Sequence, residues 1–269
     1  MSNKYFLETR FVEGPQDKRT FGIPSKTLAT LDLISIGIVS EDGRDYYAVS
    51  KDFNLSEAWN RVDKTTVGTA YNSNEEQSVT QINYIKDNML KKIFNDFLDQ
   101  EVREYLSCVD ENAKAPCSEF TYKRLEGMIS RYGKSNKEIA KEVLAFCRPN
   151  SERARAAEIV VMEPVDFPIF YCCFAARSWV VFCWLFKKMP EGFPSYCREI
   201  SQVIHQKAER LMEEVCYNSG NHTIWTLDRA LQDIKDNSDF PVQDNSKAQS
   251  ALEDAKYFEK LYTFIKDLK

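Results

Sequence analysis

The strongest constraint on the fold lies in residues 31–50, which read LDLISIGIVSEDGRDYYAVS. Leu31 to Ser40 is rich in β-branched residues, which favour strands, and the Glu-Asp-Gly that follows favours a tight turn. Arg44 to Ser50 predicts the strand on the other side of that turn. With a further strand predicted at Lys4 to Phe11, the chain is expected to open as a three-stranded antiparallel meander.

The rest of the chain alternates between helical and strand patterns. Residues 82–106 carry apolar side chains at helical spacing, whereas the Ser, Thr and Asn-rich residues 65–80 predict a loop. Further helices are expected at 125–132, 134–147, 179–188, 202–216 and 247–268, and further strands at 159–162 and 169–174. This order predicts an α/β fold in which one mixed β-sheet is flanked by helices. We expect a single domain over residues 1–269, with a helical insertion at about 80–150.

Composition and charge exclude several classes of protein. The formal net charge of -5 excludes a generic electrostatic attraction to nucleic acid or anionic lipid. The longest apolar tract, Ile159 to Phe186, is interrupted by charged residues and prolines, so no membrane span is predicted, and the first residues show no signal-peptide pattern. The eight cysteines form no CxxC pair and predict reduced thiols in a cytoplasmic protein. We expect Cys172, Cys173 and Cys183 to fill the core rather than to bind zinc.

Four stretches together resemble a known family. They are YFLETRF at 5–11, residues 31–53, SWVVFCWLF at 178–186 with GFPSYCREI at 192–200, and AQSALEDAKYFEKLYTFI at 248–265. They are similar to the DEDD 3'-5' exonuclease superfamily, in particular to the small exoribonucleases related to ribonuclease T and oligoribonuclease. The resemblance implies an RNase H-like mixed sheet.

The resemblance also implies where a catalytic site would lie. The family uses four carboxylates, a general base and two divalent ions that hold the scissile phosphate between them. The residues at the matching positions are Glu8 and Arg10 on the first strand, Ser178 before the helical aromatic run, and Gln249 and Asp254 near the C-terminus. Two of the four carboxylates remain, Glu8 and Asp254, and the base is replaced by Gln249.

These replacements predict weak metal binding and impaired catalysis. A positive charge at Arg10, about 4 Å from a divalent ion, would repel it by roughly 8 kcal/mol at an effective dielectric constant of about 20. Gln249 cannot take a proton from water at neutral pH. We therefore expect no resident cofactor, with Glu8 and Asp254 as weak metal ligands at best. An active form would need Mg²⁺ or Mn²⁺.

Several charged residues have two interpretations at this stage. Arg10 and Arg177 are candidates for phosphate binding, because a guanidinium matches the geometry of phosphate oxygens. Alternatively, Arg10 forms ion pairs with the remaining carboxylates, and Arg177 points to solvent. His205 and His222 match no position of the family motifs, so we expect surface or capping roles for them.

Three functions remain open. The leading hypothesis is a catalytically inactive or impaired member of the exoribonuclease family that retains a nucleic-acid-binding cleft for single-stranded RNA or DNA. The second is an active 3'-5' exoribonuclease with relocated ligands, for which Asp32, Glu163 and Asp166 are the candidates. The third is a scaffold protein that binds a protein partner through the insertion at about 80–150 and a cysteine-rich surface.

Overall fold

A computed structural model describes residues 4–20, 23–67, 78–108, 114–147, 168–219, 226–244 and 249–268. The predicted strand at 159–162, together with Glu163, Asp166 and His222, lies outside the described residues. The chain divides into two compact units. The first consists of Met1–Thr9, Ser35–Ala48 and Asn136–Lys269, and the second of Arg10–Ile34 and Val49–Ser135. The predicted single domain stays a prediction.

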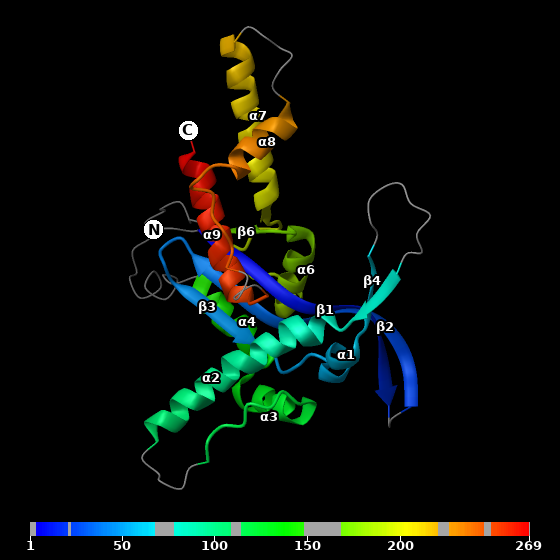
Figure 1. Cartoon of the computed structure of the whole chain (residues 1–269). Helices are drawn as coiled ribbons and strands as arrows, with labels where there is room; N and C mark the ends of the chain where they lie inside the picture. Colours follow the sequence, from blue (N-terminus) through cyan, green and yellow to red (C-terminus); the bar gives the residue numbers. More distant parts are fainter. Residues whose placement is uncertain are drawn as a thin grey trace. The chain divides into compact units, whose positions relative to one another are not determined.

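A five-stranded sheet in the order β3-β2-β1-β6-β7 organises the first unit (Figure 1). Its strands are β1 (Lys4–Thr20), β2 (Ile23–Ser40), β3 (Asp45–Val49), β6 (Ile169–Cys172) and β7 (Arg198–Glu199). The first three strands are neighbours in chain order, whereas β6 pairs with β1 and β7 pairs with β6, both in parallel. The predicted α/β class, a mixed sheet flanked by helices, is confirmed and is consistent with an RNase H-like architecture.

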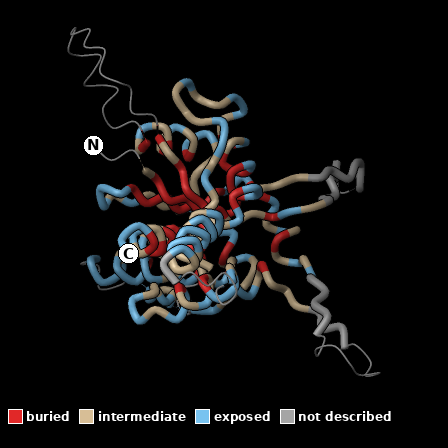
Figure 2. Tube along the Cα trace, turned by 90° about the horizontal axis from the view of Figure 1, so that it is seen from above, coloured by how far each residue is buried: buried red, intermediate tan, exposed pale blue. Residues whose placement is uncertain are grey.

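Helices cover both faces of this sheet because β1 is apolar on both. Tyr5 contacts Phe146 of α4 (Asn136–Cys147), and its hydroxyl donates to the Cys147 carbonyl at 3.1 Å. On the same face, Phe170 packs against α6 (Ala175–Phe186). Phe6 points to the opposite face and belongs to one cluster with α9 (Ala251–Asp267) and α7 (Ile200–Ser219). The buried stretches of the strands appear in red in Figure 2.

The second unit contains the predicted helical insertion. The helices of this unit are α1 (Leu55–Asn60), which precedes the predicted insertion, the π-helical turn η1 (Ile85–Leu90), which continues into α2 (Lys91–Ser107), and α3 (Tyr122–Tyr132). Ile93, Phe94 and Phe97 form the buried side of α2, as their spacing predicts. The remaining helix of the predicted insertion, α4, belongs to the first unit. Helix α8 (Leu227–Lys235) packs against α7 in the first unit.

Several boundaries differ from the sequence prediction. Residues 65–80, predicted as a loop, contain parts of the antiparallel strands β4 (Asp63–Val67) and β5 (Ser78–Ile82), with Thr65 opposite Thr80. Thr and Val have a high propensity for strands, which outweighs the polar composition of the segment. Strands β1 and β2 extend well beyond the predicted ends, because neighbouring strands satisfy each other's backbone groups where the apolar alternation fades. Helix α6 begins at Ala175, before the predicted Trp179.

No helix in the described ranges has both the length and the apolar character needed to cross a membrane.

The N-terminus of α9 lies directly against the backbone of β2. A Cβ atom at Gly37 would lie 2.3 Å from the Leu252 nitrogen and 2.4 Å from the Ala251 carbonyl group. Backbone atoms at this distance cannot be moved without shifting the whole helix. Glycine at this position therefore sets the distance between α9 and the sheet.

We expect Gly37→Ala to lower the free energy of unfolding by about 1–3 kcal/mol, because the added methyl group overlaps the α9 backbone. The measurement is chemical denaturation followed by circular dichroism. Gly127→Ala is the matched control, since Gly127 lies within α3 and a Cβ there meets nothing within 4 Å. Alanine is the better helix former, so this control should be neutral or slightly stabilising. Equal losses in both variants would contradict the packing argument.

Candidate functional site

Glu8 and Ser178 meet in the interior of the first unit. Both are buried, with 7% and 2% of their surfaces exposed, and the Ser178 hydroxyl donates to Glu8 Oε2 at 3.4 Å. Glu8 lies on β1, and Ser178 lies in the first turn of α6. Ser178, for which the resemblance predicted a position that carries aspartate, thus donates a hydrogen bond to the Glu8 carboxylate.

Glu199 positions the start of α6. Phe174 adopts a left-handed conformation, with φ 54° and ψ 45°, and provides no side-chain cap for the helix. Instead the Glu199 carboxylate accepts the backbone N–H groups of Phe174 at 3.2 Å and Ala175 at 2.6 Å. A carboxylate here satisfies otherwise unpaired donors and opposes the positive end of the helix dipole. Sequence analysis missed Glu199, since the cap is supplied from β7, far along the chain.

Asp254 is the second buried carboxylate. It is 3% exposed in the first turn of α9, and Gln243 Nε2 donates a hydrogen bond to its Oδ1. Gln243 belongs to the segment between α8 and α9, and sequence analysis did not identify it. Gln249 is half-buried and has a left-handed φ of 70°, immediately before Ser250, the N-cap residue of α9.

The buried side of α9 faces the side of β1 that carries Glu8. Lys4 Nζ lies 5.6 Å from the centre of the Tyr262 ring, and the rings of Phe6 and Tyr262 are 5.4 Å apart. Side chains two apart on a strand share a face, so Glu8 points to the same side as Lys4 and Phe6. On α9, Asp254 adjoins Ala255, which belongs to the Phe6 cluster. Glu8 and Asp254 are thus polar residues on two surfaces that pack together.

The remaining predicted residues are distributed more widely. Arg10 is half-buried on β1 in the second unit, so its position relative to Glu8 stays a prediction, as does the convergence of all five motif residues. Arg177 is exposed on α6, and His205 is exposed on α7. Asp32 is half-buried on β2 in the second unit.

The thiols near Glu8 are held in the neutral form. Burial raises the pKa of the Cys172 thiol well above its usual range, and the nearby Cys197 and the Glu8 charge act in the same direction. Burial, together with the charges of Glu199 and Glu8, raises the pKa of Cys173 to about 12. Thiolate, the form that binds metals, is therefore disfavoured at both positions. The described parts of the chain hold no group of three His, Cys, Asp or Glu residues suited to a metal ion.

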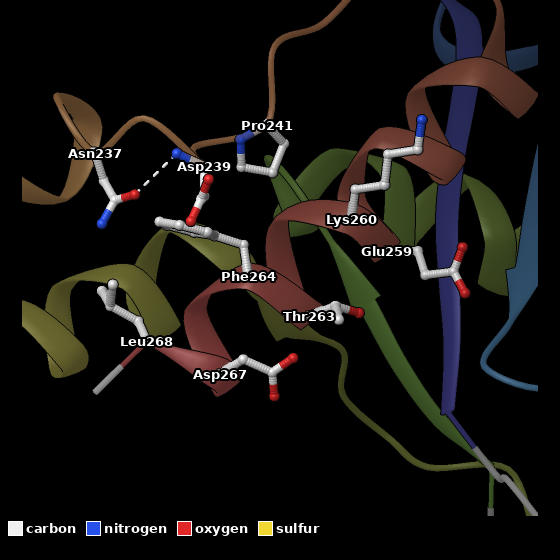
Figure 3. Close-up of a pocket in the computed structure, with 9 residues that line it drawn as sticks. All are labelled: Asn237, Asp239, Pro241, Glu259, Lys260, Thr263, Phe264, Asp267 and Leu268. Carbon is white, nitrogen blue, oxygen red and sulfur yellow. Dashed lines mark hydrogen bonds between the residues drawn. The ribbon is translucent and has the colours of Figure 1, made fainter.

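A cavity of about 600 Å³ lies away from these residues, along the C-terminal half of α9 (Figure 3). Its lining comprises Asn237, Asp239, Pro241, Glu259, Lys260, Thr263, Phe264, Asp267 and Leu268. None of the predicted site residues belongs to it. Burial raises the pKa of Glu259, an effect that the neighbouring Lys260 opposes. With three carboxylates and one ammonium group, the cavity is poorly suited to phosphate.

Comparison with known proteins gives local matches that cover a small part of the chain. No family model matches the chain. Two curated proteins of Mycobacterium tuberculosis, the 3'-5' exoribonucleases MT2234.1 and Rv2179c, are each 42% identical to it over 55 residues. The match covers 20% of this chain and only 25% of the length of each of these relatives. It supports a relationship to 3'-5' exoribonucleases over that stretch.

An aspartate beside Glu8, in the variant Ser178→Asp, should destabilise the protein when no metal is added. Two carboxylates would share one buried position, so the pKa of one of them would rise. We expect the free energy of unfolding at pH 7 to fall by about 2 kcal/mol. Because the raised pKa belongs to the folded state, part of this loss should be recovered as the pH falls toward 4. Thermal or urea denaturation at pH 4 to 7 provides the measurement.

The neutral variant Ser178→Asn is the control for this prediction. It introduces a side chain of nearly the same size without a charge, so its loss of stability should not depend on pH. Parallel pH profiles for the two variants would argue against charge repulsion between positions 8 and 178.

Proposed function

We propose that this chain is a catalytically inactive member of the 3'-5' exoribonuclease family that retains a binding site for single-stranded RNA. The observation that carries the proposal is the state of the two remaining carboxylates. Glu8 accepts a hydrogen bond from the Ser178 hydroxyl, and Asp254 accepts one from the Gln243 amide. Both are buried, and each accepts a hydrogen bond from a neutral donor of the protein itself.

A pair of divalent ions fits this donor set poorly. Hard cations such as Mg²⁺ prefer oxygen ligands and several charged ones. Of the four positions at which the family has carboxylates, Arg10 and Ser178 supply no carboxylate. The Ser178 hydroxyl and the Gln243 amide also direct protons at carboxylate oxygens of Glu8 and Asp254, the oxygens that an ion would need. The expectation of no resident cofactor rests on this mismatch in chemistry. For the alternative, an active enzyme with relocated metal ligands, Asp32 is the one candidate ligand that lies among the described residues.

Two exposed groups next to Ser178 support a role in RNA binding. Phe174 is 85% exposed at the end of β6, and Arg177 is exposed one residue before Ser178. An aromatic face and a guanidinium are the groups on which single-stranded bases stack and phosphates bind. Because the net charge is -5, the binding that we propose is local and sensitive to salt. Arg10 is a second candidate phosphate ligand.

The purified protein should bind a labelled single-stranded RNA in EDTA, without shortening it from the 3' end when Mg²⁺ or Mn²⁺ is added. Arg177→Glu should weaken binding about tenfold and reduce the salt dependence by about one phosphate contact. Fluorescence anisotropy at several salt concentrations, together with gel analysis of the RNA, measures both effects.

Arg210→Glu makes the same change of charge at an exposed position of α7 and should leave binding nearly unchanged. Metal-dependent shortening that is lost in Asp254→Ala would show that the protein is an active nuclease. Equal weakening by the two charge reversals would indicate a general electrostatic effect rather than a site at Arg177.

Four substitutions should restore metal binding if the site has otherwise kept its shape. They are Glu8→Asp, Arg10→Glu, Ser178→Asp and Gln249→His. We expect Mn²⁺ at a hundredfold excess over its dissociation constant to stabilise this variant by about 2.7 kcal/mol. Thermal unfolding with and without Mn²⁺ measures the effect, and the same variant with Asp254→Ala is the control. A well-folded fourfold variant without metal-dependent stabilisation would mean that the site itself has been remodelled.

A scaffold function has one observation in its favour. Val102, Tyr105 and Leu106 lie at i, i+3 and i+4 on α2 and are 37%, 37% and 75% exposed. Side chains at this spacing form one apolar strip on a helix, as protein-binding helices often present. Failure to bind RNA in EDTA would make this the better proposal.

A further inference from the structure

Two free cysteines lie within reach of a covalent bond in the first unit. The sulfur atoms of Cys172 and Cys197 are 3.0 Å apart. A disulfide bond requires about 2.05 Å, so a shift of about 1 Å would join them. The Cys197 thiol also lies 3.4 Å from the Phe170 carbonyl oxygen, which holds it against β6.

The sheet register accounts for this approach. Strands β6 and β7 are parallel, with Tyr171 opposite Arg198 and Cys172 opposite Glu199. Cys197 is two residues before Glu199, so it shares a sheet face with Cys172. Cys173 points to the opposite face, where it packs against the cluster on α9. The neighbouring cysteine therefore does not compete with Cys172 for this contact.

We propose that Cys172 and Cys197 form a reversible disulfide bond when the protein meets a peroxide. Cys197 is partly exposed and Cys172 is completely buried, so Cys197 is the group that an oxidant reaches. Its sulfur attacks the peroxide, the O–O bond breaks, and a sulfenic acid and one water form. The sulfur of Cys172 then attacks the sulfenic sulfur, and a second water leaves with the remaining proton. Two thiols and hydrogen peroxide thus become one disulfide and two waters.

The buried state of Cys172 is consistent with the second role. Burial keeps the Cys172 thiol away from an oxidant in solution, whereas its sulfur lies 3.0 Å from that of Cys197, where the sulfenic acid would form. A small dithiol reverses the reaction by attacking the disulfide and taking up its two electrons.

The crosslink would fix the segment that positions Ser178. The loop closed by residues 172 and 197 contains the whole of α6. Glu199, which caps the N-terminus of α6, lies just beyond Cys197. Oxidation would therefore join the two ends of the segment from Cys172 to Cys197. The crosslink would restrict the motion of this segment in both the unfolded and the folded chain. This inference does not depend on the proposed function.

The test compares the full chain before and after treatment with hydrogen peroxide. Labelling of thiols under denaturing conditions should show eight free cysteines in the reduced protein and two fewer after oxidation. Peptide mapping should identify Cys172 joined to Cys197. The melting temperature should rise by roughly 5–10 °C and return to its starting value with dithiothreitol.

In Cys197→Ser, treatment with peroxide should leave the number of free thiols unchanged and should not raise the melting temperature. The control Cys183→Ser, at a partly exposed position of α6, should respond to peroxide as the wild type does. Cys172→Ala is a second test, and the mapping of the wild-type chain needs no variant at all. The proposal is overturned if the thiol count does not change, if another pair forms, or if Cys197 is oxidised to its sulfinic acid without a crosslink.

Discussion

The structure of the first unit depends on the burial of β1 on both of its faces. Tyr5 and Leu7 point toward α4, whereas Phe6 and Glu8 point to the side that α9 covers, and all four are buried. A strand in this position must be apolar almost throughout, as parallel central strands are. Glu8 and Thr9 are buried polar residues of this strand, and the charge of Glu8 is the physical reason for expecting a site here.

A buried carboxylate must be stabilised by a metal, a cation or hydrogen-bond donors, because removing it from water is costly. Glu8 and Asp254 receive donors from Ser178 and Gln243. The same positions could serve a pair of metal ions only if those neutral donors were replaced by further oxygen ligands. The chemistry of the neighbours, rather than the presence of two acidic residues, is therefore the basis of the proposed inactivity.

The segment from β6 to β7 connects this site to the cysteine pair. Glu199 holds the N-terminus of α6, and Cys197, two residues earlier, lies beside Cys172. Both contacts come from the same pairing of two parallel strands. The placement of Ser178 and the proposed redox chemistry therefore share one structural cause, although each can be tested without the other.

The sequence by itself determined the alternation of strands and helices, since periodicity and turn residues are local properties. It predicted the hairpin at residues 31–50, the buried side of α2 and the helices around the sheet. Through a family resemblance it also predicted that Glu8, Arg10, Ser178, Gln249 and Asp254 lie together, and the structure brings Glu8 and Ser178 into contact. Only the tertiary structure revealed Gln243, Glu199 and the contact between Cys172 and Cys197. Each of these joins residues distant in sequence, so no local pattern encodes them. They follow from strand register and from the close approach of α9 at Gly37, which are decided when the chain packs.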